Sequence, residues 1–143
     1  MQIRAYQSKD AAPLADIWLA ATLSAHPFIP AEYWQANRSR MEREYLPQSE
    51  NLVLEDETGR ACAFISLLGR HIAALFVHPG AQGKGYGGAL LRRAQQLHRE
   101  LTLRVYELNT DSVHFYEYHG FSITSRSTDP ATGAVELHMR WVS

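Results

Sequence analysis

The sequence predicts an α/β domain with a mixed, mostly antiparallel sheet of about seven strands flanked by about four helices. Three observations carry this prediction. The length of 143 residues suits one domain over residues 1–143. Strand-like segments joined by short turns occupy the middle and the end of the chain. Helical patterns separate other strand-like segments, and hairpins combined with helical crossovers produce a sheet with both antiparallel and parallel neighbours.

The first third of the chain is expected to form one strand and two helices. Ile3–Tyr6 is the strand candidate. Asp10 is a plausible N-cap for the first helix, because Pro13 then falls in the first turn, where its missing N–H costs nothing. A proline-containing segment breaks that helix, and Pro30 suits the first position of a second helix that runs to about Leu46.

Strands dominate the rest of the chain. Asn51–Glu55 and Ala61–Leu68 are joined by a hairpin-like turn, and His71–Val77 is the next strand candidate. The last third of the chain is expected to form a strand at Thr102–Leu108 and a short helix at Asp111–His119. An antiparallel pair of strands at Phe121–Arg126 and Ala134–Val142 closes the chain.

A glycine-rich loop is the most informative segment. Five glycines occur within the nine residues Gly80–Gly88, directly after a strand candidate. A helix is predicted to open behind them, because Leu90, Ala94, Leu97 and Leu101 recur at helical spacing. Exposed N–H groups at a helix N-terminus form an anion site, and glycine lets the backbone approach a phosphate closely. The loop therefore predicts a phosphate-containing ligand.

Two common phosphate motifs fit this loop poorly. Gly83-x-Gly85-x-x-Gly88 matches the dinucleotide fingerprint literally, but His78–Gln82 separates the strand from the first glycine, whereas the dinucleotide turn is tight. A second mononucleotide-binding half is also missing. A P-loop is excluded because Lys84 is not followed by Ser or Thr. A dinucleotide-binding oxidoreductase is retained only as a minor alternative.

Composition excludes several classes of protein. Fourteen Lys and Arg against 15 Asp and Glu give a net charge of -1, which does not favour nucleic-acid binding. Cys62 is the sole cysteine, so no internal disulfide can form; we expect it to pack as a small hydrophobe in a cytoplasmic protein. Ile17–Leu23 is far shorter than the roughly 18 apolar residues of a membrane-spanning helix, and no signal peptide is recognisable. The histidines show no metal-ligand spacing, and no metal site is predicted.

The loop resembles the acyl-CoA pyrophosphate loop of the GNAT superfamily of N-acetyltransferases, whose motif is Gln/Arg-x-x-Gly-x-Gly/Ala. Gln82–Gly87 fits that motif without a gap. A second landmark of the family follows in order, with Asn109, then Phe115–Tyr116, then Gly120–Phe121. The resemblance extends over nearly the whole chain. It is closest to small single-domain bacterial members that carry His-Pro-Phe between the first two helices, here beginning at His26.

This resemblance implies an acyl-CoA N-acyltransferase fold and transfer of an acetyl group from acetyl-CoA to a primary amine. The acceptor would be a small-molecule amine, a protein lysine or an N-terminal amine. The resemblance implies a backbone cradle, pairing of Phe76 and Val77 with the pantetheine arm, and a contact from the motif asparagine, for which a helix N-cap is the alternative. The implied cofactor-binding residues are Phe76, Val77, Gln82, Gly83, Lys84, Gly85, Tyr86, Gly87, Gly88 and Asn109.

Tyr116 is the candidate general acid, because it stands at the family's tyrosine position and a phenol is protonated at pH 7. The alternative is that it only packs beside Val113. At the two places where members of the family carry a Glu base, this chain has His71 and Arg104. Arginine cannot act as a base, whereas histidine can. We expect one strand face to carry His71, Ala73, Leu75 and Val77, which could aim His71 at the acetyl site. The alternative is that His71 only shapes the rim of the substrate pocket, in which case water would take the proton.

The substrate pocket is expected between the first two helices and the strands that flank the loop. His26, Phe28, Tyr33 and Trp34 are the candidates, with Tyr106 as a weaker one, and the same aromatics could instead staple the two helices together. Because neither base position holds a carboxylate, a catalytically inactive acyl-CoA-binding sensor remains the alternative function. A monomer or a homodimer is expected, and the final strand could pair across a dimer.

Overall fold

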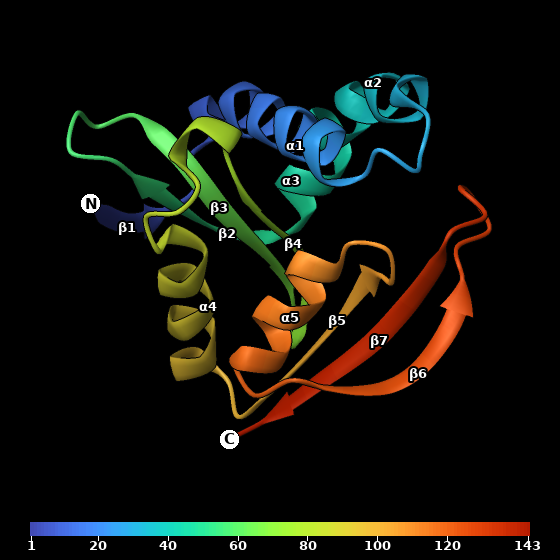
Figure 1. Ribbon diagram of the computed structural model, residues 1–143. Helices are drawn as coiled ribbons and strands as arrows, with labels where there is room; N and C mark the ends of the chain where they lie inside the picture. Colours follow the sequence, from blue (N-terminus) through green and yellow to red (C-terminus); the bar gives the residue numbers. More distant parts are fainter.

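A single seven-stranded sheet organises the computed structural model, which describes residues 1–143 (Figure 1). The strand order is β1-β2-β3-β4-β5-β7-β6, and β4–β5 is the one parallel pair. The predicted mixed, mostly antiparallel sheet is therefore confirmed. The strands are β1 (Gln2–Ala5), β2 (Glu50–Glu55), β3 (Ala61–Leu68), β4 (His71–Val77), β5 (Glu100–Tyr106), β6 (Ser122–Thr128) and β7 (Val135–Val142).

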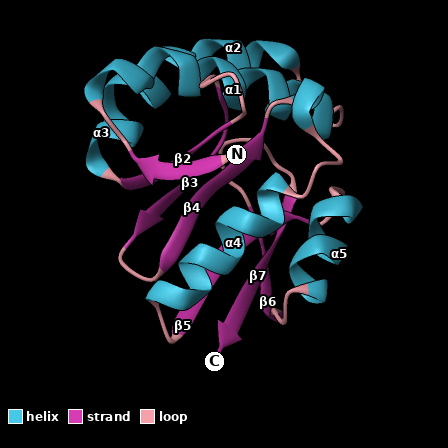
Figure 2. Ribbon diagram, turned by 90° about the vertical axis from the view of Figure 1, so that its left-hand side faces the viewer, coloured by secondary structure: helices cyan, strands magenta, loops and turns pink.

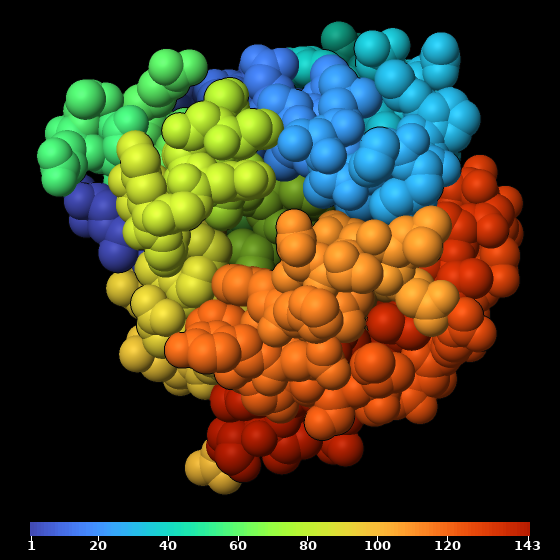
Figure 3. Space-filling view, viewed as in Figure 1, coloured from blue at the N-terminus to red at the C-terminus, as the bar shows by residue number.

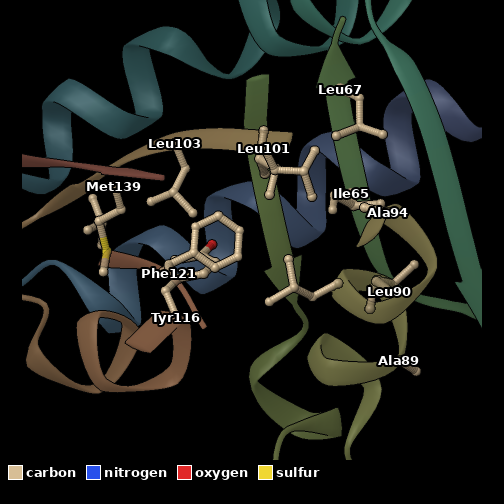
Figure 4. Close-up of a cluster of buried hydrophobic side chains, with 14 of the residues drawn as sticks. Ile65, Leu67, Ala89, Leu90, Ala94, Leu101, Leu103, Tyr116, Phe121 and Met139 are labelled. Carbon is tan, nitrogen blue, oxygen red and sulfur yellow. The ribbon is translucent and has the colours of Figure 1, made fainter. Parts of the chain in front are cut away.

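The helices form two groups on opposite faces of the sheet (Figure 2). One group packs Leu14, Trp18 and Trp34 on Phe64 of β3, and the other packs Leu90 and other apolar residues on the opposite face. Figure 4 shows part of this second core, in which α4 and α5 meet the sheet. The helices are α1 (Ala11–Ala25), α2 (Ala31–Arg40), α3 (Leu46–Gln48), α4 (Tyr86–Leu97) and α5 (Thr110–Tyr118).

The N-terminal helices follow the prediction with two differences. α1 begins directly after Asp10, but the Asp10 carboxylate does not cap it. Instead it accepts two hydrogen bonds from the Arg4 guanidinium, at 2.8 and 2.9 Å, because this pairing satisfies both carboxylate oxygens at once. The expected second helix is continuous from α2 to α3, with a π-helical turn at Met41–Tyr45 between them.

The face that α4 buries is shorter than its sequence pattern predicted. Leu90 and Ala94 are fully buried, as expected. Leu97 is 59% exposed, because the helix ends there and His98 is already extended. Leu101 is buried as well, but as part of β5. Leu101 matches the helical spacing only by chance. A strand that enters the same core also needs apolar residues.

A β-bulge in β4 changes the direction in which its side chains point. Ser66 of β3 pairs with Ala74 and the next residue pairs with Ile72, so Ala73 has no partner. Ile72 and Leu75 consequently both pack in the core beneath α4, although three positions separate them. The expectation that His71, Ala73, Leu75 and Val77 share one face is therefore wrong. The extra residue places His71 on the opposite face, toward α1.

The two central strands separate soon after they meet. β4 and β5 pair only at His71–Thr102 and Ile72–Leu103. Beyond these residues the β5 side of β4 has no strand partner, so backbone groups of β4 are available to a ligand. The opening between the strands is the feature of the fold that positions the site.

β7 lies inside the sheet, with β5 on one side and β6 on the other. Both of its edges are therefore occupied, and the suggestion that the final strand pairs across a dimer is wrong. The free edges of the sheet belong to β1 and β6.

Cys62 is buried in the core, as predicted for a small hydrophobe. Its Sγ lies 3.5 Å from the carbonyl oxygen of Leu54, and burial raises the pKa of the thiol. No helix of the chain combines the length and the apolar character needed to cross a membrane. No group of three or more His, Cys, Asp and Glu side chains is arranged to hold a metal ion.

Candidate active site

The glycine loop presents a row of unused backbone donors at the start of α4. Gly83 and Gly85 both have φ near +81°, a conformation that side chains rarely tolerate, and Gly85 immediately precedes the helix. None of the backbone N–H groups of Gln82–Gly88 donates to an acceptor within the chain. A Cβ placed on Gly83 or Gly85 would meet no atom within 4 Å. The loop is thus an open cradle that fits a pyrophosphate.

A cavity of about 380 Å³ adjoins this cradle, and we call it the loop cavity. In Figure 3 the surface is hollowed between α1, the loop and α5. Eight of the ten implied cofactor-binding residues line the loop cavity, and Lys84 and Asn109 do not. Lys84 lies beside a separate polar cavity, and Asn109 lies beside the second cavity described next. The eight are Phe76, Val77, Gln82, Gly83, Gly85, Tyr86, Gly87 and Gly88.

The second cavity, also about 380 Å³, lies between α1, α2 and strands β4, β5 and β7, and we call it the acceptor cavity. It shares Leu75, Phe76, Ser112 and Tyr116 with the loop cavity. The two cavities therefore meet where β4 separates from β5. A ligand held by the glycine loop and a second molecule entering the acceptor cavity would come together at these four residues.

The predicted aromatic residues divide into two that line the acceptor cavity and two that support them. His26 and Trp34 line it, and both are buried. Phe28 packs behind them with its ring centroid 5.6 Å from that of His26, and Tyr33 packs 4.9 Å from Trp34. Tyr106 also lines the cavity, and its hydroxyl donates a 2.7 Å hydrogen bond to Asp129. The cluster lines a cleft and staples the helices at once.

Tyr116 lines both cavities. Its ring packs in the core against Phe121, with 5.6 Å between the ring centroids (Figure 4). Its hydroxyl has no hydrogen-bond partner within the chain. The hydroxyl oxygen is not sealed inside the core, so it is open to the cavities. Burial raises the pKa of the phenol, which keeps it protonated at neutral pH. Tyr116 is thus a core residue whose protonated hydroxyl has no partner within the chain.

His71 reaches the acceptor cavity from the start of β4. Its Nδ1 lies 2.9 Å from Thr102 Oγ1 on the paired strand, which holds the ring in place. Burial lowers the pKa of His71, and the positive charges of Arg104 and His138 lower it further. The ring is therefore neutral at pH 7 and able to accept a proton.

His26 joins the acceptor cavity to the start of α5. Asn109 caps α5 by accepting a hydrogen bond from the Ser112 N–H at 3.3 Å, so its amide nitrogen faces His26 Nε2, 3.2 Å away. Nε2 must then accept, and the proton of the neutral ring lies on Nδ1, which has no partner. Burial lowers the pKa of His26 to about 4. Asn109 can therefore serve both as a helix N-cap and as a ligand contact, since an N-cap residue at the cavity wall is accessible to a ligand.

A pH dependence of stability follows from buried His26. Its pKa of about 4 in the folded chain lies below the ordinary 6.5, so the unfolded chain binds more protons between these values. The free energy of unfolding is therefore expected to fall as the pH is lowered from about 6.5 to about 4. Urea titrations of the wild type and of His26→Gln, which stays neutral, should show a difference that shrinks steadily as the pH decreases. Parallel curves would contradict the assignment.

Glu136 is a residue of the acceptor cavity that the sequence pattern did not single out. In the sequence of β7, Glu136, His138 and Arg140 alternate with apolar residues, which indicates that they share a polar face. Nothing in the sequence, however, showed that β7 pairs with β5, which sets Glu136 beside Tyr106. The polar alternation could therefore identify Glu136 as a residue of a polar face, but it could not predict which strand lies beside it.

Comparisons with known proteins agree with this geometry. The family model described as acetyltransferase (GNAT) domain matches residues 47–123. The peptidyl-lysine N-acetyltransferase YiaC of Escherichia coli K12 is 35% identical over 97% of this chain and 95% of its own length. YjaB of the same organism, also named a peptidyl-lysine N-acetyltransferase, is 33% identical over 89% of this chain and 86% of its own.

Solved structures match over almost the full chain. The solution structure of apo YjaB from Escherichia coli has a TM-score of 0.87 at 30% identity, covering 99% of this chain and 97% of that one. The PaiA N-acetyltransferase of Thermoplasma acidophilum, in complex with coenzyme A, has a TM-score of 0.83 at 18% identity, covering 99% and 98%, and shows a shared fold. The fold and the joined cavities are thus those of an acetyl-CoA-dependent N-acetyltransferase. The chain belongs to the GNAT acetyltransferase family.

Proposed function

We propose that this enzyme acetylates the Nζ amine of lysine side chains in proteins or peptides. The observation that carries the proposal is the meeting of the loop cavity with the acceptor cavity at Leu75, Phe76, Ser112 and Tyr116. An extended aliphatic amine suits a cavity whose floor is mainly apolar. The names of the two relatives, both peptidyl-lysine N-acetyltransferases, support the choice of lysine over other amines.

The glycine loop and β4 are proposed to hold acetyl-CoA, whose thioester carbonyl an amine can attack. The free N–H groups of Gln82–Gly88 would bind the pyrophosphate, helped by the dipole of α4. Phe76 and Val77 lie on the part of β4 that has no β5 partner, so their backbone can pair with an extended pantetheine arm. An N–H on this edge would stabilise the negative oxygen that forms during the attack.

Tyr116 is proposed as the general acid and His71 as the base. The protonated phenol of Tyr116 faces the point where the cavities meet, so it can give its proton to the thiolate that leaves. A lysine amine has a pKa near 10.4 and must lose a proton before it attacks. The neutral ring of His71 lies in the same acceptor cavity and can take that proton directly or through a water.

The proposal is tested with acetyl-CoA and a peptide that has a blocked N-terminus and a single lysine. We expect thiol release and a mass increase of one acetyl group on the lysine. The same peptide with norleucine in place of lysine is the control and should give neither. Turnover with spermidine but not with the lysine peptide would contradict the proposed acceptor. Stabilisation by acetyl-CoA without turnover on any amine would favour the sensor function.

A further inference from the structure

Glu136 is the only carboxylate that lines the acceptor cavity. It is half-buried and makes no hydrogen bond or ion pair within the chain, whereas neighbouring carboxylates are occupied. Asp129 accepts from the Tyr106 hydroxyl at 2.7 Å and from the Ala131 N–H at 2.9 Å. Glu107 pairs with Arg126 at 2.8 Å. A partly desolvated carboxylate without a partner is costly unless a ligand supplies the missing charge.

The sheet register places Glu136 among the polar groups of the cavity. Glu136 of β7 pairs with Tyr106 of β5. His138, two residues further along β7, pairs with Arg104, so all four side chains share one face of the two strands. Burial and the negative charge of Asp129 raise the pKa of Glu136, whereas the positive charges of Arg104 and His138 lower it. Arg104 is exposed and makes no ion pair with Glu136. The carboxylate is thus available to a cation that enters the cavity.

We propose that Glu136 is the specificity-determining residue that recognises the positively charged ammonium group of the acceptor. This inference rests on the proposed function only in taking the acceptor to be an alkyl amine. Such an amine is charged at neutral pH, and a carboxylate with free oxygens binds it through charge-assisted hydrogen bonds. Glu136 is partly exposed and lines the acceptor cavity, so an amine that enters from solvent can reach its carboxylate. Arg104, on the neighbouring strand β5, repels the same cation.

The test measures binding rather than turnover. Trp18 and Trp34 line the acceptor cavity and report occupancy by fluorescence. N-acetyl-lysine N-methylamide and its uncharged analogue N-acetyl-norleucine N-methylamide, which lacks Nζ, are titrated into protein saturated with CoA. We expect the wild type to prefer the lysine probe about tenfold, the effect of one hydrogen bond to a charged group. Glu136→Gln should lose this preference and bind the norleucine probe with unchanged affinity.

Two further variants separate recognition from a structural role. Glu107→Gln removes the same charge outside the cavity and should keep the preference for lysine. Arg104→Gln removes the opposing cation and should tighten binding of the lysine probe. If the substitutions instead damaged the cavity, Glu136→Gln and Arg104→Gln would each bind both probes more weakly. The proposal is overturned if Glu136→Gln keeps the lysine preference, or if Arg104→Gln and Glu136→Gln change lysine affinity in the same direction.

Failure of this inference is distinguishable from failure of the proposed function. If the wild type distinguishes the two probes through Glu136 but acetylates no lysine peptide, the recognition site stands and the proposed activity falls. If Glu136→Gln acetylates the lysine peptide with the KM of the wild type, the recognition site falls and the proposed activity stands.

Discussion

Replacing Tyr116 with phenylalanine is expected to lower kcat by about 10²–10⁴-fold, the range typical of losing a general acid. The hydroxyl is the only group removed, and it makes no hydrogen bond within the chain. The ring keeps its contact with Phe121, so the free energy of unfolding should change little. The departing thiolate would then lack its proton donor, while binding of acetyl-CoA and of the acceptor would persist.

The measurement is steady-state kinetics with the lysine peptide, together with thermal melts in the presence and absence of acetyl-CoA. Tyr118→Phe is the matched control, because Tyr118 lies on the same helix with 85% of its surface exposed. It should retain wild-type kcat. If Tyr116→Phe also retains wild-type kcat, Tyr116 is a packing residue and the proton must come from elsewhere.

Replacing Gly85 with valine is expected to weaken acetyl-CoA binding at least about tenfold. Gly85 has φ of +81° immediately before α4, and a β-branched residue in that conformation is strained. Relief of the strain would move the loop and turn its N–H groups away from a common point. The new side chain would also project into the open space of the cradle, where no protein atom lies within 4 Å.

Gly59→Val is the matched control for this prediction. Gly59 has φ of +84° and equally free surroundings, but it lies in the turn between β2 and β3. Both variants should lower the Tm to a similar extent, since a left-handed non-glycine residue costs about 1–2 kcal/mol. Calorimetric titration with acetyl-CoA should distinguish them, with only Gly85→Val losing affinity. Equal affinity in the two variants would show that the loop does not hold the ligand.

The local sequence determined a large part of this protein. The bounds of β3 and β4 were predictable, because alternation and turn residues act over a few positions. A helix next to the glycine segment was also predictable, but α4 begins at Tyr86, inside that segment rather than behind it. The motifs at Gln82–Gly87 and Asn109–Phe121 were sufficient to predict the family, which the comparisons confirm. Sequence patterns also identified Tyr116 and His71 as candidates, and the structure brings both to the acceptor cavity.

Tertiary structure alone decided the orientation and neighbours of those residues. The bulge at Ala73 reverses the face of His71, and it depends on how β4 registers with β3. The tautomer of His26 depends on Asn109, which lies 83 positions away in the sequence. Glu136 reaches the acceptor cavity because β7 inserts between β5 and β6. Register, strand order and contacts between distant segments arise from packing of the whole chain, and short-range patterns carry no information about them.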